Sequence, residues 1–193
     1  MSEKRSGKKW NREETILAYD LYCRTPFGKI HSGNNDIINL AKLLGRTPGS
    51  VALKMSNLAH LDPELRKRHR TGMAHGSKLD AEVSNEFMND WSGLSYQAQL
   101  ILSRMQNKDI TQNVSVNDIS DLPKGWNREQ VLKERVGQQF FRASVLNSYE
   151  NRCCITGINN SELLIASHIV VLRITWYCKR HLVLHRFLLM CWL

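Results

Sequence analysis

Two short helical patterns separated by one glycine constrain this fold more than any other feature of the sequence. In residues 36–45, apolar side chains recur every three or four positions, Asp36 can cap the helix and Gly45 can end it. A second such pattern follows at once over residues 47–58, where Thr47 can cap and Pro48 fits the first turn. Two helices joined by a tight glycine-containing turn are typical of helix-turn-helix DNA binders.

The stretch before these helices supplies a third one. Asn11 followed by Glu14 predicts a capping box, and apolar residues at helical spacing then run towards Arg24, where Pro26 requires the helix to end. Residues 1–9, rich in Lys, Ser and Gly, are expected to form a disordered basic arm, with order beginning at Trp10. We therefore predict a helical DNA-binding domain over residues 10–78.

The candidate DNA contacts of this domain lie directly before the third helix, on it and after it. The residue types on its expected outer face can reach phosphates or base edges, although any small three-helix domain would expose similar side chains. A basic cluster follows, which could track phosphates or be a solvated linker. The predicted DNA-binding residues are Arg46, Ser50, Lys54, Asn57, Arg66, Lys67, Arg68 and Arg70.

The charge distribution agrees with a polyanionic partner. Residues 1–78 carry 15 Lys and Arg against 7 Asp and Glu, whereas residues 79–162 carry 8 against 11 and residues 163–193 carry 4 against none. A concentrated positive field binds nucleic acid by releasing its condensed counterions. Anionic lipid or structured RNA would satisfy the same charge.

Cysteine usage and hydropathy indicate a cytoplasmic protein without a membrane span. The 5 cysteines form no CxxC pair, and no charged-then-apolar leader opens the chain, which argues against secretion and a disulfide scaffold. The most apolar stretch, residues 182–193, is too short and too polar to cross a bilayer, which takes about 20 apolar residues.

The middle of the chain is predicted to be helical and then irregular. Two helices are expected over residues 79–91 and 95–105, separated by Ser92-Gly93; the second is apolar enough for a core or for the contact of a homodimer. Residues 107–127 turn to Asn, Asp, Ser and Thr and are the predicted linker. A further helix is predicted over residues 129–149.

After that helix, two β-prone runs appear at residues 153–157 and 163–170, and we expect them to form a β-hairpin beginning at Cys153. The segments Phe141-Arg142, Val145-Leu146, Tyr149, Arg152 to Gly157 and Leu163 to Ile169 resemble the start of the HNH (ββα-metal) domain of bacterial restriction-type endonucleases. Residues 10–58 resemble, more weakly, the amino-terminal region of such proteins. The resemblance implies a partial HNH nuclease domain over residues 128–170.

The resemblance also implies catalytic roles. His168 corresponds to the general base that takes a proton from water so that hydroxide can attack a phosphodiester. A divalent metal (Mg²⁺, Mn²⁺, Ni²⁺ or Zn²⁺) would neutralise the scissile phosphate and the leaving oxygen. Arg142 is the second candidate for the catalytic site. Arg142 and Arg152 are candidates for contacts to the DNA backbone, although Arg142 could equally pair within the fold. Cys153 and Cys154 are expected to be small buried hydrophobes rather than zinc ligands.

The family pattern stops after His168. Residues 171–193 form an atypical tail that contains no asparagine and no acidic residue, so the metal-binding half of the motif is missing. His181 and His185 share a helical spacing and could join His168 on a metal. A change of reading frame near residue 170 is the simpler hypothesis, and it predicts a tail that contributes nothing to folding.

Together these observations predict a mainly α protein with a small α+β C-terminal part: an N-terminal helix-turn-helix-like bundle, residues 79–106 as a helical segment, and an incomplete HNH unit. The predicted function is cleavage of double-stranded DNA by an HNH-type endonuclease that is catalytically incomplete in this chain. The alternative is a non-enzymatic DNA-binding protein, either a regulator or a nuclease remnant. A basic RNA-associated protein is a third possibility.

Overall fold

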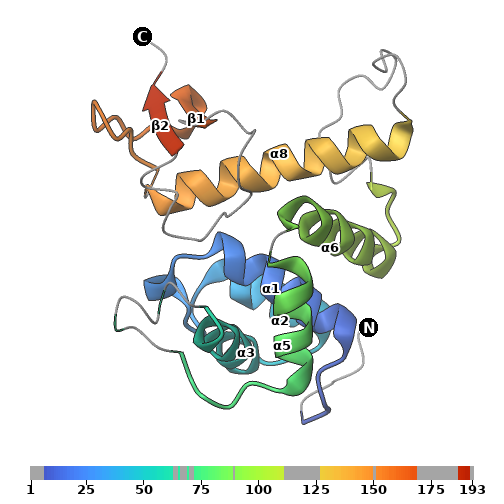
Figure 1. Cartoon of the computed structure of the whole chain (residues 1–193). Coiled ribbons are helices and arrows are strands. Elements are labelled where there is room, and N and C mark those ends of the chain that lie inside the picture. The colour runs from blue at the N-terminus through green and yellow to red at the C-terminus, as the bar shows by residue number, and fades with distance from the viewer. Residues whose placement is uncertain are drawn as a thin grey trace.

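The fold is mainly helical, as the sequence predicts. The computed structural model describes residues 7–62, 65, 69, 72–88, 90–110, 127–149, 151–168 and 187–191. In Figure 1 the long helix α8 lies across one side of a bundle of shorter helices, and the two strands sit at its C-terminal end. The helices are α1 (Arg12–Arg24), α2 (Asn35–Leu44), α3 (Pro48–His60), α5 (Lys78–Phe87), α6 (Trp91–Gln106) and α8 (Arg128–Ser148), with 3-10 turns η1 (Phe27–Lys29) and η2 (Ser161–Leu163); the strands are β1 (Leu164–His168) and β2 (Phe187–Cys191).

The ends of the first three helices follow from local sequence. The predicted capping box is present, because the Asn11 side chain accepts from the Glu14 N–H and the Glu14 carboxylate accepts from the Asn11 N–H. Gly45 ends α2 with a left-handed φ of 66°. Thr47 caps α3 with Pro48 in its first turn. These predictions are confirmed.

The cap predicted for α2 is wrong by two residues. Asn34, not Asp36, accepts the hydrogen bond at the start of this helix, and its acceptor oxygen lies 2.9 Å from the Asp36 nitrogen. Asp36 instead occupies the first turn, where a carboxylate is favoured by the helix dipole. Two good capping residues close together made the boundary ambiguous.

The predicted break at Ser92-Gly93 is also wrong. Helix α5 ends earlier, at Phe87, and α6 begins at Trp91, so both residues lie inside the first turn of α6. Asp90 caps that turn by accepting from the Gly93 N–H at 2.8 Å. A Cβ at Gly93 would come within 2.1 Å of the Asp90 carboxylate, so glycine serves the cap rather than a linker.

One hydrophobic core joins segments that the sequence divided. Buried residues of α1, α2 and α3 pack in the same cluster as Val83 of α5, Leu94 of α6 and Phe140 of α8. The ring of Phe140 lies 5.6 Å from that of Trp91. The boundary predicted at residue 78 therefore does not separate two cores. Most of the predicted linker, residues 111–126, lies outside the described part of the chain.

The C-terminal strands pair differently from the prediction. Residues 153–157 form a tight turn instead of a strand, because the Cys153 N–H donates to the Ile158 carbonyl and the Cys153 carbonyl accepts from the Gly157 N–H. Strand β1 pairs antiparallel with β2, and His168 lies opposite Phe187. The hairpin expected at Cys153 is wrong, and so, for these five residues, is the expectation that the tail contributes nothing to the fold. Within the described segments, no helix combines the length and apolar composition needed to cross a bilayer.

Candidate nucleic-acid interface

Several of the residues that carry the HNH resemblance pack in a small second core. It lies in what we call the C-terminal unit: the end of α8, the turn at 151–160, η2 and β1. Val145, Cys153 and Leu164 are buried together, and Tyr149 and Phe141 pack against them. This core is separate from that of the helical bundle. It fixes the start of β1 against α8, and β1 ends at His168.

Arg142 holds the C-terminal unit together. One end of its guanidinium donates to the Leu164 carbonyl at 2.6 Å, and the other donates to the Ser161 carbonyl at 2.7 Å. Both acceptors are backbone groups at the entrance to β1. Of the roles left open by the sequence, the structure shows Arg142 pairing within the fold, where it holds the strand that bears His168.

The turn between α8 and β1 is built around a cysteine. The Thr156 N–H donates to the Cys153 sulfur at 3.3 Å, and Gly157 takes a left-handed φ of 73° that favours glycine. Cys153 is buried, as predicted, whereas Cys154 is exposed, contrary to the prediction. Burial raises the pKa of the Tyr149 phenol, and the neighbouring Cys154 thiol raises this pKa further. Arg152, the predicted backbone contact, is exposed beside this turn.

The described residues do not form a metal site. No group of three His, Cys, Asp or Glu side chains gathers anywhere in them. The sulfur of Cys153 is buried and engaged by the turn, so it does not offer a free ligand. His181 and His185 lie outside the described residues. His168 is thus the one member of the predicted metal set that the described backbone places.

Helix α3 does not present the basic face that the sequence predicted. Lys54 is buried, with a side-chain exposure of 5%, and its ammonium lies 2.6 Å from the carboxylate of Asp80, which is 0% exposed. Its assignment to the outer, DNA-binding face is therefore wrong: an ammonium engaged by a buried carboxylate is not available to a phosphate. Of the other candidates on α3, Ser50 and Asn57 are half-buried, and Leu53 is exposed. Among the described residues, no donor reaches the buried Oδ1 of Asn57.

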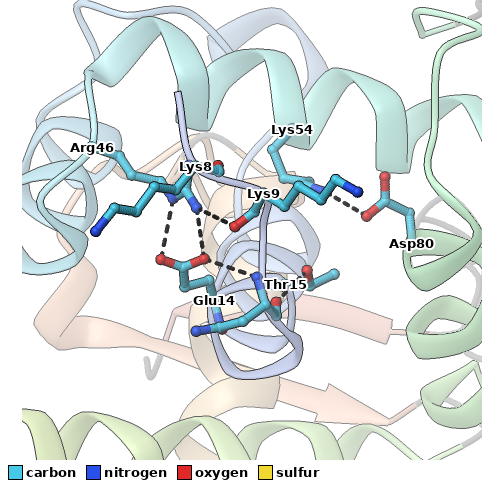
Figure 2. Close-up of polar contacts among 8 residues, drawn as sticks. Lys8, Lys9, Glu14, Thr15, Arg46, Lys54 and Asp80 are labelled. Carbon is cyan, nitrogen blue, oxygen red and sulfur yellow. Dashed lines mark hydrogen bonds and ion pairs between the residues drawn. The ribbon is translucent and has the colours of Figure 1, made fainter. Parts of the chain in front are cut away.

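Arg46 is also an internal residue rather than a surface contact. Its Nε and Nη2 donate to the two carboxylate oxygens of Glu14 at 3.2 and 2.8 Å, and its guanidinium lies 4.3 Å from the centre of the Trp10 ring. Two further bonds run to the backbone carbonyls of Lys8 and Lys9, each 3.0 Å long. Figure 2 shows this network with the Lys54–Asp80 pair beside it. The prediction that Arg46 contacts DNA is corrected, because its donors are used inside the fold.

Much of the positive charge of the bundle is likewise paired. Between Lys8 and Lys78 the structure describes nine lysines and arginines, and at least five of them form ion pairs: Arg12 with Glu86, Arg24 with Asp20, Arg46 with Glu14, Lys54 with Asp80 and Lys78 with Glu82. Arg66, Lys67, Arg68 and Arg70 of the predicted basic cluster lie outside the described residues. The excess charge seen in the sequence is therefore not carried by α3.

The partners of the two buried cations, Trp10, Glu14 and Asp80, were not predicted from the sequence. Glu14 was assigned only to a helix cap, and Asp80 lies 26 positions from the lysine it pairs with. No local pattern links residues so far apart. The one signal available was an acidic residue at a position flanked by the apolar stripe of α1.

Comparison of the chain with protein-family models, with curated proteins and with solved structures finds no match in any of the three.

Proposed function

We propose that this chain is an HNH-type endonuclease by descent that binds double-stranded DNA and cleaves it poorly or not at all. The observation that supports the proposal is the C-terminal unit, in which Val145, Cys153 and Leu164 of the motif are buried in one small core and Arg142 donates to two carbonyls at the entrance to β1. This core holds the start of β1 against α8, and His168 lies at the other end of the same strand.

In the proposed chemistry, His168 acts as a neutral imidazole that takes a proton from water. The hydroxide then attacks the phosphorus, and the bond to the leaving oxygen breaks. That oxygen departs with a negative charge, which in this class of enzyme is neutralised by a divalent metal. The tail after residue 170 contains no asparagine and no acidic residue, so in this proposal the site keeps the base but lacks the side chains that would hold a metal at the leaving group. Slow or absent cleavage follows from this imbalance.

A supercoiled-plasmid assay tests the proposal, because it reports binding as a shift and cutting as a nicked circle. The full chain is titrated onto plasmid with Mg²⁺, Mn²⁺, Ni²⁺ or Zn²⁺, beside His168→Ala and a control His31→Ala at an exposed histidine. We expect a salt-sensitive shift for all three proteins and little nicking by any. Efficient nicking that is lost only in His168→Ala would refute the proposed incompleteness, and no shift at low salt would refute DNA binding.

The second candidate is a DNA-binding protein with no ancestral cleavage. Its support is the succession of three short helices, α1, α2 and α3, at the start of the chain. Structured RNA competing better than duplex DNA would instead favour the RNA-associated class.

We attribute the loss of the motif after His168 to a change of reading frame near residue 170. The pairing of β2 with β1 is the observation that stands against this, since it gives residues 187–191 a place in the fold. Translation of the other two frames of the gene beyond codon 170 tests it. A proline-tryptophan, an asparagine and a downstream histidine in one of those frames would support the frame change, and their absence from both would refute it.

A further inference from the structure

Half of the large apolar side chains that are exposed in the described residues lie in the C-terminal unit. Eight such side chains are exposed, and four of them fall within residues 155–165: Ile155 (69%), Ile158 (40%), Leu163 (48%) and Ile165 (43%). The other four are spread over α3, the segment before α5, and α6. Single apolar residues on a surface need no explanation, whereas a group of them marks a site of interaction. We call these four residues the apolar patch.

Strand β1 is apolar on both of its faces. Leu164 is 1% exposed and packs with Val145 of α8, while the next residue, Ile165, points to the opposite face. An antiparallel sheet with one face in water normally carries polar residues on that face. In Figure 1, α8 lies between the two strands and the helical bundle, so the bundle does not cover this outer face of β1.

The edge of β1 is less open than its outer face. At the start of the strand the Leu164 N–H donates to the Ser161 carbonyl, and the Leu164 carbonyl accepts from the Arg142 guanidinium at 2.6 Å. A partner strand that pairs with an edge requires backbone groups that are free. The surface that the C-terminal unit offers is therefore one of side chains, which favours face-to-face packing over the addition of a strand.

The charges beside the apolar patch indicate which kind of partner fits it. Residues 151–168 contain no lysine, one arginine (Arg152) and one acidic residue (Glu162), and both charged residues are exposed. Within the described residues neither of them forms an ion pair. DNA requires an excess of positive charge and a basic protein an excess of negative charge, and this surface has neither. About a two-fold axis the same surface meets itself, so Arg152 of one copy can face Glu162 of the other.

We propose that two copies of this chain form a homodimer by packing their apolar patches together about a two-fold axis. The patches form the centre of the contact, and two Arg152–Glu162 pairs, one from each side of the axis, form its rim. This surface differs from residues 95–105, where the sequence allowed the contact of a homodimer. Ile165 and His168 belong to the same strand, so the dimer brings together the two strands that bear His168.

Sedimentation velocity of the full chain over a range of concentrations tests the dimer, with a thiol reductant present because Cys154 is exposed. We compare the wild type with the patch variant Ile155→Thr/Ile165→Thr, in which threonine keeps the branched shape that suits a strand. The matched control is Leu53→Gln/Leu100→Gln, at exposed positions of α3 and α6. The patch variant should raise the dissociation constant of the dimer by about tenfold or more, because each copy loses apolar surface at two positions. The control should leave this constant unchanged, and circular dichroism checks that both variants are folded.

Reversal of the rim charges tests the two-fold arrangement. Arg152→Glu places two acidic residues opposite each other at both ends of the contact and should raise the dissociation constant by about tenfold or more. The swap Arg152→Glu/Glu162→Arg restores opposite charges, so it should return the dissociation constant to near the wild-type value. A structural role of either residue within its own chain would not produce this recovery.

Three results would overturn the proposal. They are a wild type that stays monomeric at the highest concentration reached, a dimer weakened equally in the patch variant and the control, and a charge swap without recovery. The first would mean that the apolar patch is covered in another way, by the chain itself or by a different protein. None of these measurements includes DNA, so their failure leaves the proposed function standing, and the plasmid assay tests that function separately.

Discussion

Replacing Lys54 by methionine is expected to destabilise the fold strongly. The ammonium of Lys54 lies 2.6 Å from the Asp80 carboxylate and 4.9 Å from the centre of the Trp10 ring. The methionine leaves a fully buried carboxylate that keeps the N–H of Ser77 as a partner but has no counter-ion. Breaking a buried ion pair from one side costs about 3–5 kcal/mol, a large part of the roughly 5–15 kcal/mol that stabilises a domain.

Urea denaturation followed by circular dichroism measures this loss. The double variant Lys54→Met/Asp80→Asn removes both charges, so it should be more stable than Lys54→Met by about 1.5 kcal/mol or more. Lys78→Met is the control, because Lys78 is 93% exposed and lies 3.7 Å from its partner Glu82; its effect should stay within about 0.5 kcal/mol. The folded Lys54→Met protein should keep the wild-type salt slope for DNA.

The reasoning would be refuted by a Lys54→Met protein as stable as the control, or by one that is stable but loses a phosphate contact. The first result would mean that Lys54 is solvated. The second result would mean that Lys54 lies on the DNA-binding face, as predicted from the sequence.

Three further predictions concern other parts of the fold. Arg142→Met removes two hydrogen bonds to backbone carbonyls, each worth about 1.5–3 kcal/mol. Amide exchange in residues 161–168 should therefore accelerate while that of α1 stays slow. Equal exchange rates in the variant and the wild type would contradict the role of Arg142 in holding β1. Gly72→Ala places a Cβ 1.9 Å from a backbone oxygen of α3 and should lower the melting temperature, whereas Gly28→Ala, with nothing within 4 Å, should not; similar melting of the two variants would count against this close approach. Burial and the Cys154 thiol raise the pKa of Tyr149, so its contribution to stability is present below about pH 10 and lost as the pH rises through the folded pKa. Ultraviolet titration against Tyr149→Phe measures this pKa, and Cys154→Ser should lower it; a Tyr149 pKa at the ordinary value would refute the burial.

The parts of the fold that sequence predicts well are those with local causes. The capping box at Asn11, the left-handed Gly45 and the Thr47-Pro48 start each depend on residues within four positions of one another. The order of the helices in the bundle follows from these signals. Strand β1 lies within the β-prone run predicted at residues 163–170.

The parts that sequence missed depend on distant partners. Whether Lys54 faces solvent or core is decided by Asp80, which belongs to another helix, and a helical pattern treats any lysine as exposed. The same holds for Arg46, whose carboxylate partner lies 32 positions away. The prediction of strand pairing was wrong for a related reason. The backbone groups of Cys153 form hydrogen bonds within their own turn, and β1 pairs with β2 in the tail. Local rules do not encode which of two possible partners is used.

Because the proposed function depends on DNA binding, the decisive measurement is equilibrium binding of the full chain to a short duplex at increasing salt. We expect binding at low salt that weakens linearly on a log–log scale, with the DNA recovered largely intact after incubation with Mg²⁺ or Mn²⁺. Absence of binding at low salt, or binding that does not respond to salt, would contradict it.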